Sequence, residues 1–473
     1  MIDLENLTIK KAHEDIKNGK YSAVDLTKAY LKEIEKKNGE LNAYLEVFTD
    51  AVEQAVVADE RFRAGTANLL TGIPFAIKDN ILIKGRIASS ASKILENYHA
   101  VYDATVIEKL KREGVVFLGR TNMDEFAMGG STENSAYGVT KNPHDTNRVP
   151  GGTSGGSAVA VSANMCLVAL GSDTGGSVRQ PSAYCGILGL KPTYGAVSRY
   201  GLMAAVSSFD QIGPMARNIE DVEIVFNLIK GKDENDSTTI SDDTYSKIKS
   251  ERKPVIGIIK SLLNQGGISK DILNNFNESL EKFKKLGYEI KDIEIPSVSQ
   301  VLPIYYILNF AEISSNMSRF DGMRFGLHKD GKDGIDDYFQ TRGAGLGKEV
   351  RRRILLGTYV LSSGYYDAYY NRANALRRVI TSDFLHAFEN VDIILTPTTP
   401  APAFKIGEKI SDPVAMYIED IFTVTANLTG MPAISIPSGV SIVDGHSLPL
   451  GLQLMSSHGK ENVLFAVSAE FLK

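Results

Sequence analysis

Residues 150–177 read PGGTSGGSAVAVSANMCLVALGSDTGGS, in which two clusters rich in glycine and hydroxyl groups flank an apolar segment. Glycine admits backbone conformations that other residues avoid and lets a ligand approach closely. Two such clusters predict a site where backbone N–H groups and serine or threonine oxygens converge. The sequence has no histidine between His144 and His328, so a hydroxyl nucleophile in this stretch needs a different base.

On either side of this stretch, strand patterns alternate with helical patterns. Apolar runs predict strands at 72–78, 115–118, 167–171, 255–259, 289–295, 391–395, 433–436 and 450–455. Helical spacing predicts two helices over 7–38, and Ser22 could cap the second of them. Further helices are predicted at 51–64, 103–113, 158–163, 270–286, 347–388 and from 461. The alternation predicts an α/β fold with a largely covered sheet. The polar segment 231–252 is the best candidate for a domain boundary and is expected to form a surface loop with a short helix.

Composition excludes several classes of protein. The chain has 473 residues and a formal net charge of −5, and its densest basic run, Lys348 with 351–353, is predicted to form the solvated face of a helix. A nucleic-acid surface is therefore not expected on this chain. The two cysteines, Cys166 and Cys185, form no CxxC pair, which argues against a thiolate metal site and for buried thiols in a reducing compartment. The absence of an apolar signal core or of a run of about 20 apolar residues predicts a cytoplasmic protein with no membrane contact.

Ser177 is the first candidate catalytic residue. It ends Asp173-Thr174-Gly175-Gly176-Ser177, a glycine-rich turn whose successive N–H groups are suited to an oxyanion hole. For the pentapeptide alone, the alternative of a helix entry with serine as N-cap is the commoner structure.

Lys78 is the second candidate, because it closes an apolar strand and lysine is rarely buried without a partner. Burial lowers the pKa of an ammonium group, and a neutral lysine can take a proton from a serine. The alternative is an ordinary ion pair with the adjacent Asp79.

Other catalytic motifs match this sequence weakly. Residues 152–156 fit the G-x-S-x-G elbow of α/β-hydrolases, but no strand is predicted before them and the late histidines, His446 and His458, lie in loop-like sequence. Residues 90–93 fit S-x-x-K without a Lys-Thr-Gly partner, and 151–157 lack the Gly-Lys-Ser/Thr of a P-loop.

The whole run 150–214 closely resembles the signature of the amidase-signature family of serine amidohydrolases. The resemblance implies an α/β/α sandwich with a mixed central sheet covered by helices, formed by one domain over 1–473. Within it, residues 1–64 would form a helical layer, 65–220 the catalytic core, and 221–473 the remaining sheet with substrate-recognition residues.

The same resemblance assigns catalytic roles. Ser177 matches the acyl-enzyme nucleophile, the N–H groups of 174–177 (Thr174, Gly175, Gly176 and Ser177) match the oxyanion hole, and GIPFAIKDNI around Lys78 matches the strand that carries the general base. In the family, a serine on a cis peptide 24 residues before the nucleophile relays the proton. Here that position is Thr153, which keeps the hydroxyl and adds a methyl group that stiffens χ1. Ser154 remains an alternative relay.

Four segments, 121–138, 190–214, 362–370 and 397–404, resemble the tRNA-amidotransferase branch of the family. In that branch, an arginine matching Arg353 holds the glutamine α-carboxylate, and a bidentate guanidinium fork suits this task. An aspartate matching Asp420 holds the α-ammonium group. A tyrosine matching Tyr305, with Tyr306 as the alternative, and Gly129 complete the substrate-binding residues that the resemblance implies.

The resemblance implies a glutaminase that supplies ammonia for amidation of Glu-tRNA(Gln), Asp-tRNA(Asn) or both. A B subunit would activate the charged tRNA with ATP and Mg, and a small C subunit would hold the pair together. This chain itself is expected to bind no metal and no cofactor. Two alternatives are a free-standing amidase acting on another small amide and an inactive scaffold subunit.

Overall fold

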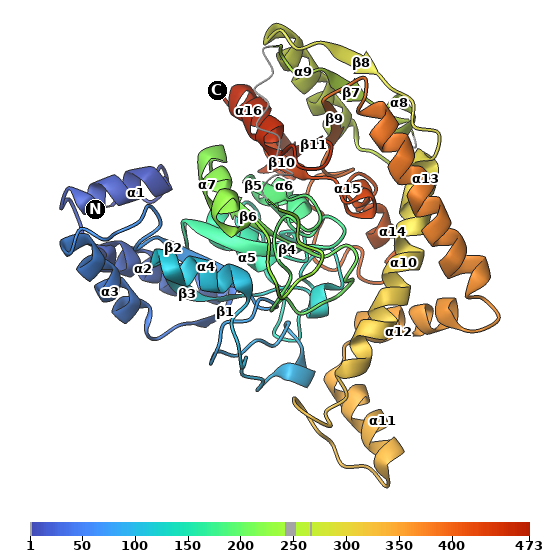
Figure 1. Ribbon diagram of the computed structural model, residues 1–473, viewed down its shortest axis with the longest axis horizontal. Helices are drawn as coiled ribbons and strands as arrows, with labels where there is room; N and C mark the ends of the chain where they lie inside the picture. The colour runs from blue at the N-terminus through green and yellow to red at the C-terminus, as the bar shows by residue number, and fades with distance from the viewer. Residues whose placement is uncertain (1, 242–251, 265–266) are drawn as a thin grey trace.

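Three helices form the N-terminal layer of the molecule. The computed structural model describes residues 2–241, 252–264 and 267–473 (Figure 1). The layer consists of α1 (Ile9–Lys17), α2 (Ala23–Leu41) and α3 (Ala51–Arg63). Ser22 and Asp25 form a capping box at the start of α2, in which each side chain accepts a hydrogen bond from the other residue's backbone N–H. The predicted helices and the Ser22 cap are therefore confirmed.

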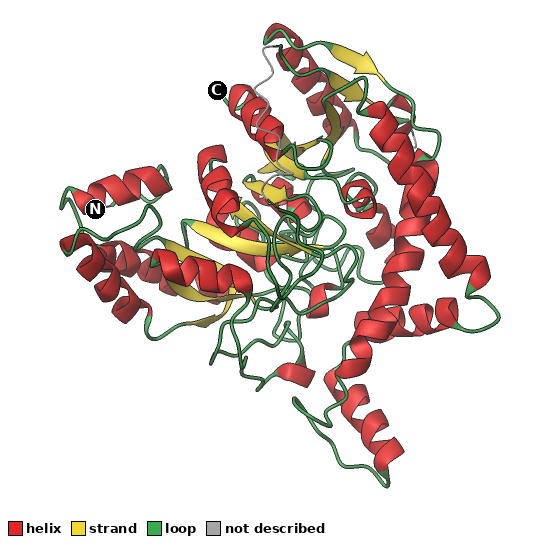
Figure 2. Cartoon of the chain, in the orientation of Figure 1, coloured by secondary structure: helices red, strands yellow, loops and turns green. Residues whose placement is uncertain are grey.

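An eleven-stranded mixed sheet runs through the described molecule (Figure 2). Its strands are β1 (Tyr44–Val47), β2 (Pro74–Lys78), β3 (Val116–Thr121), β4 (Val168–Asp173), β5 (Leu188–Lys191), β6 (Gln211–Ala216), β7 (Ile256–Ile258), β8 (Ile290–Asp292), β9 (Ile393–Pro397), β10 (Ala433–Val443) and β11 (His446–Met455). Their spatial order is β1-β3-β2-β4-β6-β5-β10-β11-β9-β7-β8. Pairs β2–β3, β2–β4, β7–β8 and β7–β9 are parallel, and the other neighbours are antiparallel.

Helices cover this sheet along its length (Figure 1). The remaining α-helices are α4 (Thr105–Glu113), α5 (Gly155–Ser162), α6 (Arg179–Cys185), α7 (Ile219–Ile229), α8 (Lys260–Leu263), α9 (Lys270–Lys285), α10 (Val301–Asn316), α11 (Gly334–Gly345), α12 (Lys348–Leu361), α13 (Arg372–Ala387), α14 (Pro413–Ile418), α15 (Val424–Thr429) and α16 (Glu461–Phe471). Helix α5 packs on β2 and β4, α6 on β10 and β11, and α10 against α12, α13 and α15. The predicted α/β architecture with a mixed, helix-covered sheet is confirmed.

The sheet brings Lys78 and the glycine-rich turn to the same edge. Strands β2 and β4 are parallel neighbours, with Ile77 opposite Leu170. Lys78 is the last residue of β2, and Asp173 is the last residue of β4. Because the carboxyl ends of parallel strands lie at one edge of a sheet, the segments that follow β2 and β4 meet there.

Several elements were not predicted from the sequence. Strand β1, which pairs with β3 at the sheet edge, lies between two predicted helices. The run 347–388, predicted as helical, is interrupted by a π-helical turn at Asp367–Asn371 between α12 and α13. The prediction of a loop with a short helix over 231–252 falls partly on 242–251, which lie outside the described residues; residues 232–240 form turns. Both cysteines are free and buried, as expected.

Candidate active site

Lys78 lies in the protein interior with its amine among hydroxyl groups. Its side chain has no exposed surface. Lys78 Nζ lies 2.7 Å from Thr153 Oγ1, 2.8 Å from Ser154 Oγ and 3.0 Å from Ser172 Oγ. Burial lowers the pKa of Lys78 to about 7, although carboxylates including Asp124 act in the opposite direction. A substantial fraction of Lys78 is therefore neutral near pH 7.

The alternative ion pair between Lys78 and Asp79 is wrong. Asp79 instead accepts a hydrogen bond from Arg120 at 2.9 Å and another from Ser89 at 2.5 Å. The carboxylates that act to raise the pKa of Lys78 are Asp124, Asp173 and Asp210 rather than Asp79. Ser172, at the end of β4, was not singled out from the sequence, and its hydroxyl also accepts a hydrogen bond from Asn80 at 2.9 Å.

Thr153 and Ser154 both contact Lys78, but their other partners differ. The peptide bond between Gly152 and Thr153 is cis. Ser154 Oγ donates its proton to the carbonyl oxygen of Ser172 at 3.1 Å. Within the described chain, Thr153 Oγ1 bonds to Lys78 alone. The Thr153 hydroxyl therefore keeps a free position for a second partner, whereas the Ser154 proton is already committed to a backbone carbonyl.

Ser177 sits in the turn between β4 and α6, where its side chain is almost fully buried. The Ser154 N–H donates to the Ser177 carbonyl oxygen at 3.0 Å, which places the two glycine-rich clusters side by side. Helix α6 starts after Val178 and has no side-chain cap, so the alternative in which Ser177 caps a helix is wrong. Ser177 Oγ has no hydrogen-bond partner in the described part of the chain.

Asp173 holds the turn in shape. Its carboxylate accepts hydrogen bonds from the N–H groups of Gly176 at 2.9 Å and Val178 at 3.1 Å. It also forms a fully buried ion pair with Arg179 at 2.9 Å. The pKa of Asp173 lies well below its usual range because the Arg179 charge and hydrogen bonds outweigh the effect of burial.

One of the four predicted oxyanion donors is therefore occupied. The Gly176 N–H already donates to Asp173. The N–H groups of Thr174, Gly175 and Ser177 have no partner among the described residues. These three groups are the donors available to a developing oxyanion.

Arg353 projects from α12 into the interior. Its Nε donates to Glu349 Oε1 at 2.8 Å, and its guanidinium lies 5.4 Å from the centre of the Tyr417 ring. Tyr417 OH donates to the same Glu349 oxygen at 3.0 Å. The Glu349 carboxylate and neighbouring phenols raise the pKa of Arg353 further, so the guanidinium stays charged despite its burial. The prediction that this basic run forms one face of a helix, exposed to solvent, does not apply to Arg353.

Asp420 provides a half-buried acceptor whose pKa is affected by the Arg353 charge. Tyr306 OH donates to Asp420 Oδ2 at 2.6 Å. Burial raises the pKa of Asp420 to about 7, while Tyr306 and the Arg353 charge act to lower it. The neighbouring Tyr305 has a different partner from Tyr306: its OH donates to the Thr174 carbonyl oxygen at 3.2 Å. Of the two phenols, Tyr306 therefore contacts Asp420, and Tyr305 contacts the turn that carries Ser177.

Gly129 lines a cavity of about 490 Å³ beside these residues, together with Glu349 and Tyr417. A side chain at Gly129 would collide with Asp124, whose Oδ1 would lie 2.3 Å from the added Cβ. Asp124 accepts hydrogen bonds from the N–H groups of 131, 132 and 134, and burial raises its pKa to about 6. Asp124, which the sequence did not single out, therefore packs this loop against the catalytic core.

The other catalytic motifs do not form sites. Ser90 Oγ contacts Met203, and Lys93 pairs with Glu96, so the S-x-x-K motif brings no serine and lysine together. His458 bonds to the Thr429 carbonyl, and His446 begins β11, so neither serves Ser154 as an elbow would require. No group of three or more His, Cys, Asp or Glu residues within 2–241, 252–264 and 267–473 is arranged to hold a metal ion.

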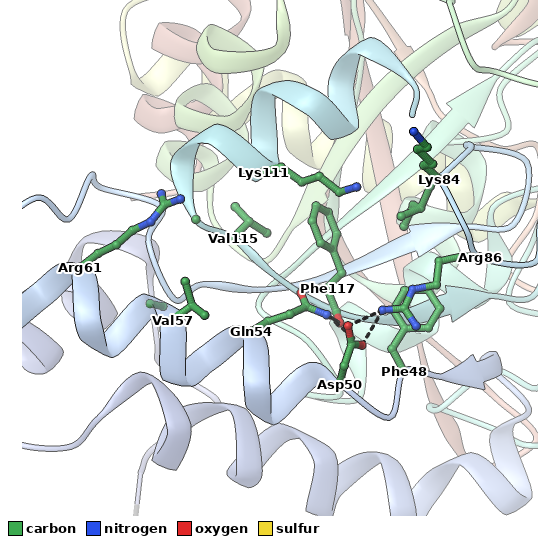
Figure 3. Close-up of a pocket in the computed structure, with 13 residues that line it drawn as sticks. Phe48, Asp50, Gln54, Val57, Arg61, Lys84, Arg86, Lys111, Val115 and Phe117 are labelled. Atoms are coloured by element: carbon green, nitrogen blue, oxygen red, sulfur yellow. Dashed lines mark hydrogen bonds and ion pairs between the residues drawn. The ribbon is translucent and has the colours of Figure 1, made fainter. Parts of the chain in front are cut away.

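A second cavity, of about 300 Å³, opens between α3 and α4 (Figure 3). Apolar side chains including Phe48 and Phe117 line it, and basic residues surround them. Arg86 there pairs with Asp50 at 2.5 Å, and Lys111 pairs with Asp103 at 2.7 Å. None of the predicted site residues lines this cavity. The candidate active site instead lies at the carboxyl ends of β2 and β4.

The chain is similar to known proteins over nearly its whole length. The amidase family model matches residues 25–465. Over 99% of its length, the chain is 50% identical to the A subunit of glutamyl-tRNA(Gln) amidotransferase from Thermoanaerobacter pseudethanolicus, and it covers 96% of that protein. The crystal structure of the corresponding subunit from Thermotoga maritima is 40% identical with a TM-score of 0.79, covering all of this chain and 94% of that one. The peptide amidase of Stenotrophomonas maltophilia is 27% identical with a TM-score of 0.83, covering 99% and 97%.

Proposed function

The chain belongs to the amidase family, and we propose that it is the glutamine-hydrolysing subunit of a tRNA-dependent amidotransferase. The observation that carries the proposal is the combination of a Lys78–Thr153 pair beside Ser177 with two opposite charges, the buried Arg353 and the half-buried Asp420. An amide-hydrolysing centre needs the first group, and recognition of a free amino acid needs the second.

In the proposed reaction, Ser177 Oγ attacks the side-chain carbonyl carbon of glutamine. The Ser177 proton passes to Thr153 Oγ1, whose own proton passes to neutral Lys78. The N–H groups of Thr174, Gly175 and Ser177 stabilise the oxyanion that forms. Collapse of this intermediate breaks the C–N bond, and Lys78 returns the proton through Thr153 to the leaving nitrogen, which departs as ammonia. Water then attacks the acyl-enzyme by the same relay and releases glutamate.

Lys78 suits this role because it is both buried and adjacent to the relay. A base with a pKa of about 7 is partly neutral at physiological pH and can return the proton during the same cycle. Ser172 Oγ, which accepts a hydrogen bond from Asn80, also contacts the Lys78 amine.

Recognition of glutamine follows from charge. The Arg353 guanidinium presents its Nη groups to the α-carboxylate while Glu349 holds its Nε. The Asp420 carboxylate accepts hydrogen bonds from the α-ammonium group, and Tyr306 OH orients this carboxylate. Tyr305 reaches the oxyanion turn, so its OH lies between the recognition residues and the reacting atoms.

The ammonia acceptor lies outside this chain. The curated relative from Thermoanaerobacter pseudethanolicus is named for Glu-tRNA(Gln), which favours this tRNA over Asp-tRNA(Asn) as the one served. We propose a B subunit that binds the charged tRNA and uses ATP and Mg, and a C subunit that joins the two, in the cytoplasm. The net charge of −5 agrees with tRNA contact through the B subunit. None of the described helices is long and apolar enough to span a bilayer.

Two alternative functions can be compared with the proposed one. A free-standing amidase is consistent with the fold, since a peptide amidase shares it, but it does not require the opposite charges of Arg353 and Asp420. An inactive scaffold would have no need for an intact Lys78 and Ser177. The deciding experiment measures ammonia release from glutamine by the chain alone and with B and C subunits, Glu-tRNA(Gln) and ATP. Acceleration in the complex supports the proposal, whereas equal rates favour the free-standing amidase.

A further inference from the structure

A continuous hydrogen-bond chain joins Arg353 to the turn that carries the oxyanion donors. Arg353 Nη1 donates to Asn309 Oδ1 at 3.4 Å, and Asn309 Nδ2 donates to Tyr305 OH at 3.1 Å. Tyr305 OH in turn donates to the Thr174 carbonyl oxygen at 3.2 Å. Asn309 and Tyr305 are one turn apart on α10, and all four residues are buried. The chain therefore runs where water competes little for its hydrogen bonds.

The direction of every bond in this chain is determined by Arg353. Arginine has only donors, so the oxygen of the Asn309 amide must face it and the amide nitrogen must face Tyr305. Tyr305 has one proton, and because it accepts from Asn309 it can donate that proton to Thr174. Asn309 is thus the residue that sets the orientation of the Tyr305 hydroxyl.

A second contact joins the Asp420 segment to the same turn. Thr423 Oγ1 donates to the Gly175 carbonyl oxygen at 2.6 Å. The Thr423 N–H donates to the Asp420 carbonyl oxygen at 3.0 Å, so Thr423 belongs to the same local turn as Asp420. Both residues proposed to bind the charged end of glutamine are therefore connected to the backbone of the oxyanion turn.

The two glycines of the turn make room for these two hydroxyl groups. A Cβ on Gly175 would lie 2.2 Å from Tyr305 OH, and a Cβ on Gly176 would lie 2.4 Å from Thr423 Oγ1. Neither distance is compatible with a side chain unless the hydroxyl groups withdraw. The glycines thus serve the approach of Tyr305 and Thr423, in addition to any effect on backbone conformation.

Holding a carbonyl also orients a neighbouring N–H group. In a planar trans peptide the C=O and N–H bonds point in opposite directions. Tyr305 holds the Thr174 carbonyl, which directs the Gly175 N–H, of the same peptide, to the opposite side. That N–H is one of the three donors without a partner in the described chain.

We propose that Asn309 and Thr423 are positioning residues that couple binding of the amino-acid end of glutamine to the orientation of the oxyanion turn. The inference rests on the proposed function of this site. When the α-carboxylate and α-ammonium groups hold Arg353 and Asp420 in place, the two connections hold the Thr174 and Gly175 carbonyls. Binding energy from the charged end is then used at the reacting amide, which an amide without these charges cannot supply.

The test compares glutamine with butanamide, which has the amide but neither charge. Asn309→Leu keeps a similar volume and removes both hydrogen bonds. We expect this variant to lower kcat for glutamine about 10- to 100-fold, which is at most the effect of losing a whole oxyanion donor. We expect its KM for glutamine to stay within about threefold of the wild-type value. For butanamide we expect a loss of kcat of about threefold or less, so the glutamine-to-butanamide ratio of kcat falls.

Thr423 offers an independent pair of variants. Thr423→Val keeps the shape and removes the hydroxyl, whereas Thr423→Ser keeps the hydroxyl. We expect the glutamine-to-butanamide ratio of kcat to fall in the valine variant as it does in Asn309→Leu. In the serine variant we expect most of the wild-type ratio to be retained. Thermal melts identify a variant that fails to fold, and the serine rescue still tests the inference if Asn309→Leu does not fold.

An unchanged kcat, a rise in KM alone, or equal losses on the two amides would each overturn the coupling. A rise in KM alone would mean that Asn309 only helps Arg353 to bind the carboxylate. If the wild-type chain releases no ammonia from glutamine, the proposed function fails as well; if it does and the ratio is unchanged in the variants, only the coupling fails.

Discussion

Lys78 Nζ lies 2.7 Å from Thr153 Oγ1, and neither side chain is exposed to solvent. A buried amine with a pKa of about 7 is suited to proton transfer when it lies next to a hydroxyl that has no second partner among the described residues. Ser154 lies almost as near, at 2.8 Å, but its proton is bonded to the Ser172 carbonyl. The relationship between Lys78 and Thr153 therefore distinguishes two hydroxyl groups that are adjacent in sequence.

The first prediction concerns this distinction. Thr153→Ser should remain active, because it keeps the oxygen and removes only a methyl group. Thr153→Val keeps the shape and loses the oxygen, so glutaminase activity should fall by roughly 10²- to 10⁴-fold, the usual contribution of a proton-transfer group. Ser154→Ala, as the matched control, should lose far less in the same steady-state assay. An active Thr153→Val variant beside an inactive Ser154→Ala variant would make Ser154 the relay.

The second prediction concerns the chemical nature of the base. Lys78→Ala and Lys78→Arg should both be inactive, because arginine keeps the positive charge but is not deprotonated in proteins. Ammonia release from glutamine measures the effect, and circular dichroism checks that both variants fold. Near-native turnover by Lys78→Arg would mean that residue 78 supplies only charge.

The pH dependence of the reaction follows from the pKa of about 7 for Lys78. The neutral amine is the active base, so kcat should rise as pH increases through about 7 and then level off. The pKa of Asp420 is also raised to about 7. Because its ionised form binds the ammonium group, glutamine binding through Asp420 should also improve as pH increases. Butanamide separates the two effects because it carries no ammonium group. A profile on butanamide that is flat between pH 6 and 8 would contradict the role of Lys78.

A further prediction concerns recognition of the two charges of glutamine. Arg353→Ala should weaken glutamine binding by about 2 to 5 kcal/mol, the usual loss when one partner of a buried charge pair is removed. Asp420→Ala should have an effect of similar size at the other end of the substrate. Kinetics on glutamine and on butanamide provide the comparison, and butanamide should be much less affected. Equal losses on the two substrates would mean that these residues are structural.

Much of the fold could be predicted from the sequence because its signals are local. The strand before Lys78 is a short apolar run, and Ser22 heads a helix with an acidic residue three positions later, so each pattern reports its own structure. Strand β1 has only four residues, Tyr44–Val47, and its pairing with β3 depends on residues about 75 positions away. Such pairing is not visible in local periodicity.

The site could be predicted only in part for the same reason. Lys78 and Ser177 lie in recognisable local sequence, whereas Ser172, Asn309 and Thr423 act through contacts with distant segments. The Gly176 N–H was expected to be a free donor, but the preceding Asp173 carboxylate accepts its hydrogen bond. Which donor is free depends on where a side chain folds back, and the sequence of the turn does not show this.

The nucleophile is the centre of the account, and one measurement tests it directly. The chain is incubated with an electrophilic analogue of glutamine and the modified residue is identified by mass spectrometry of its peptides. We predict a single covalent adduct on Ser177, absent from Ser177→Ala, which should also release no ammonia from glutamine while remaining folded. An adduct on Ser154 or Ser90, or undiminished labelling of Ser177→Ala, would contradict the assignment of Ser177.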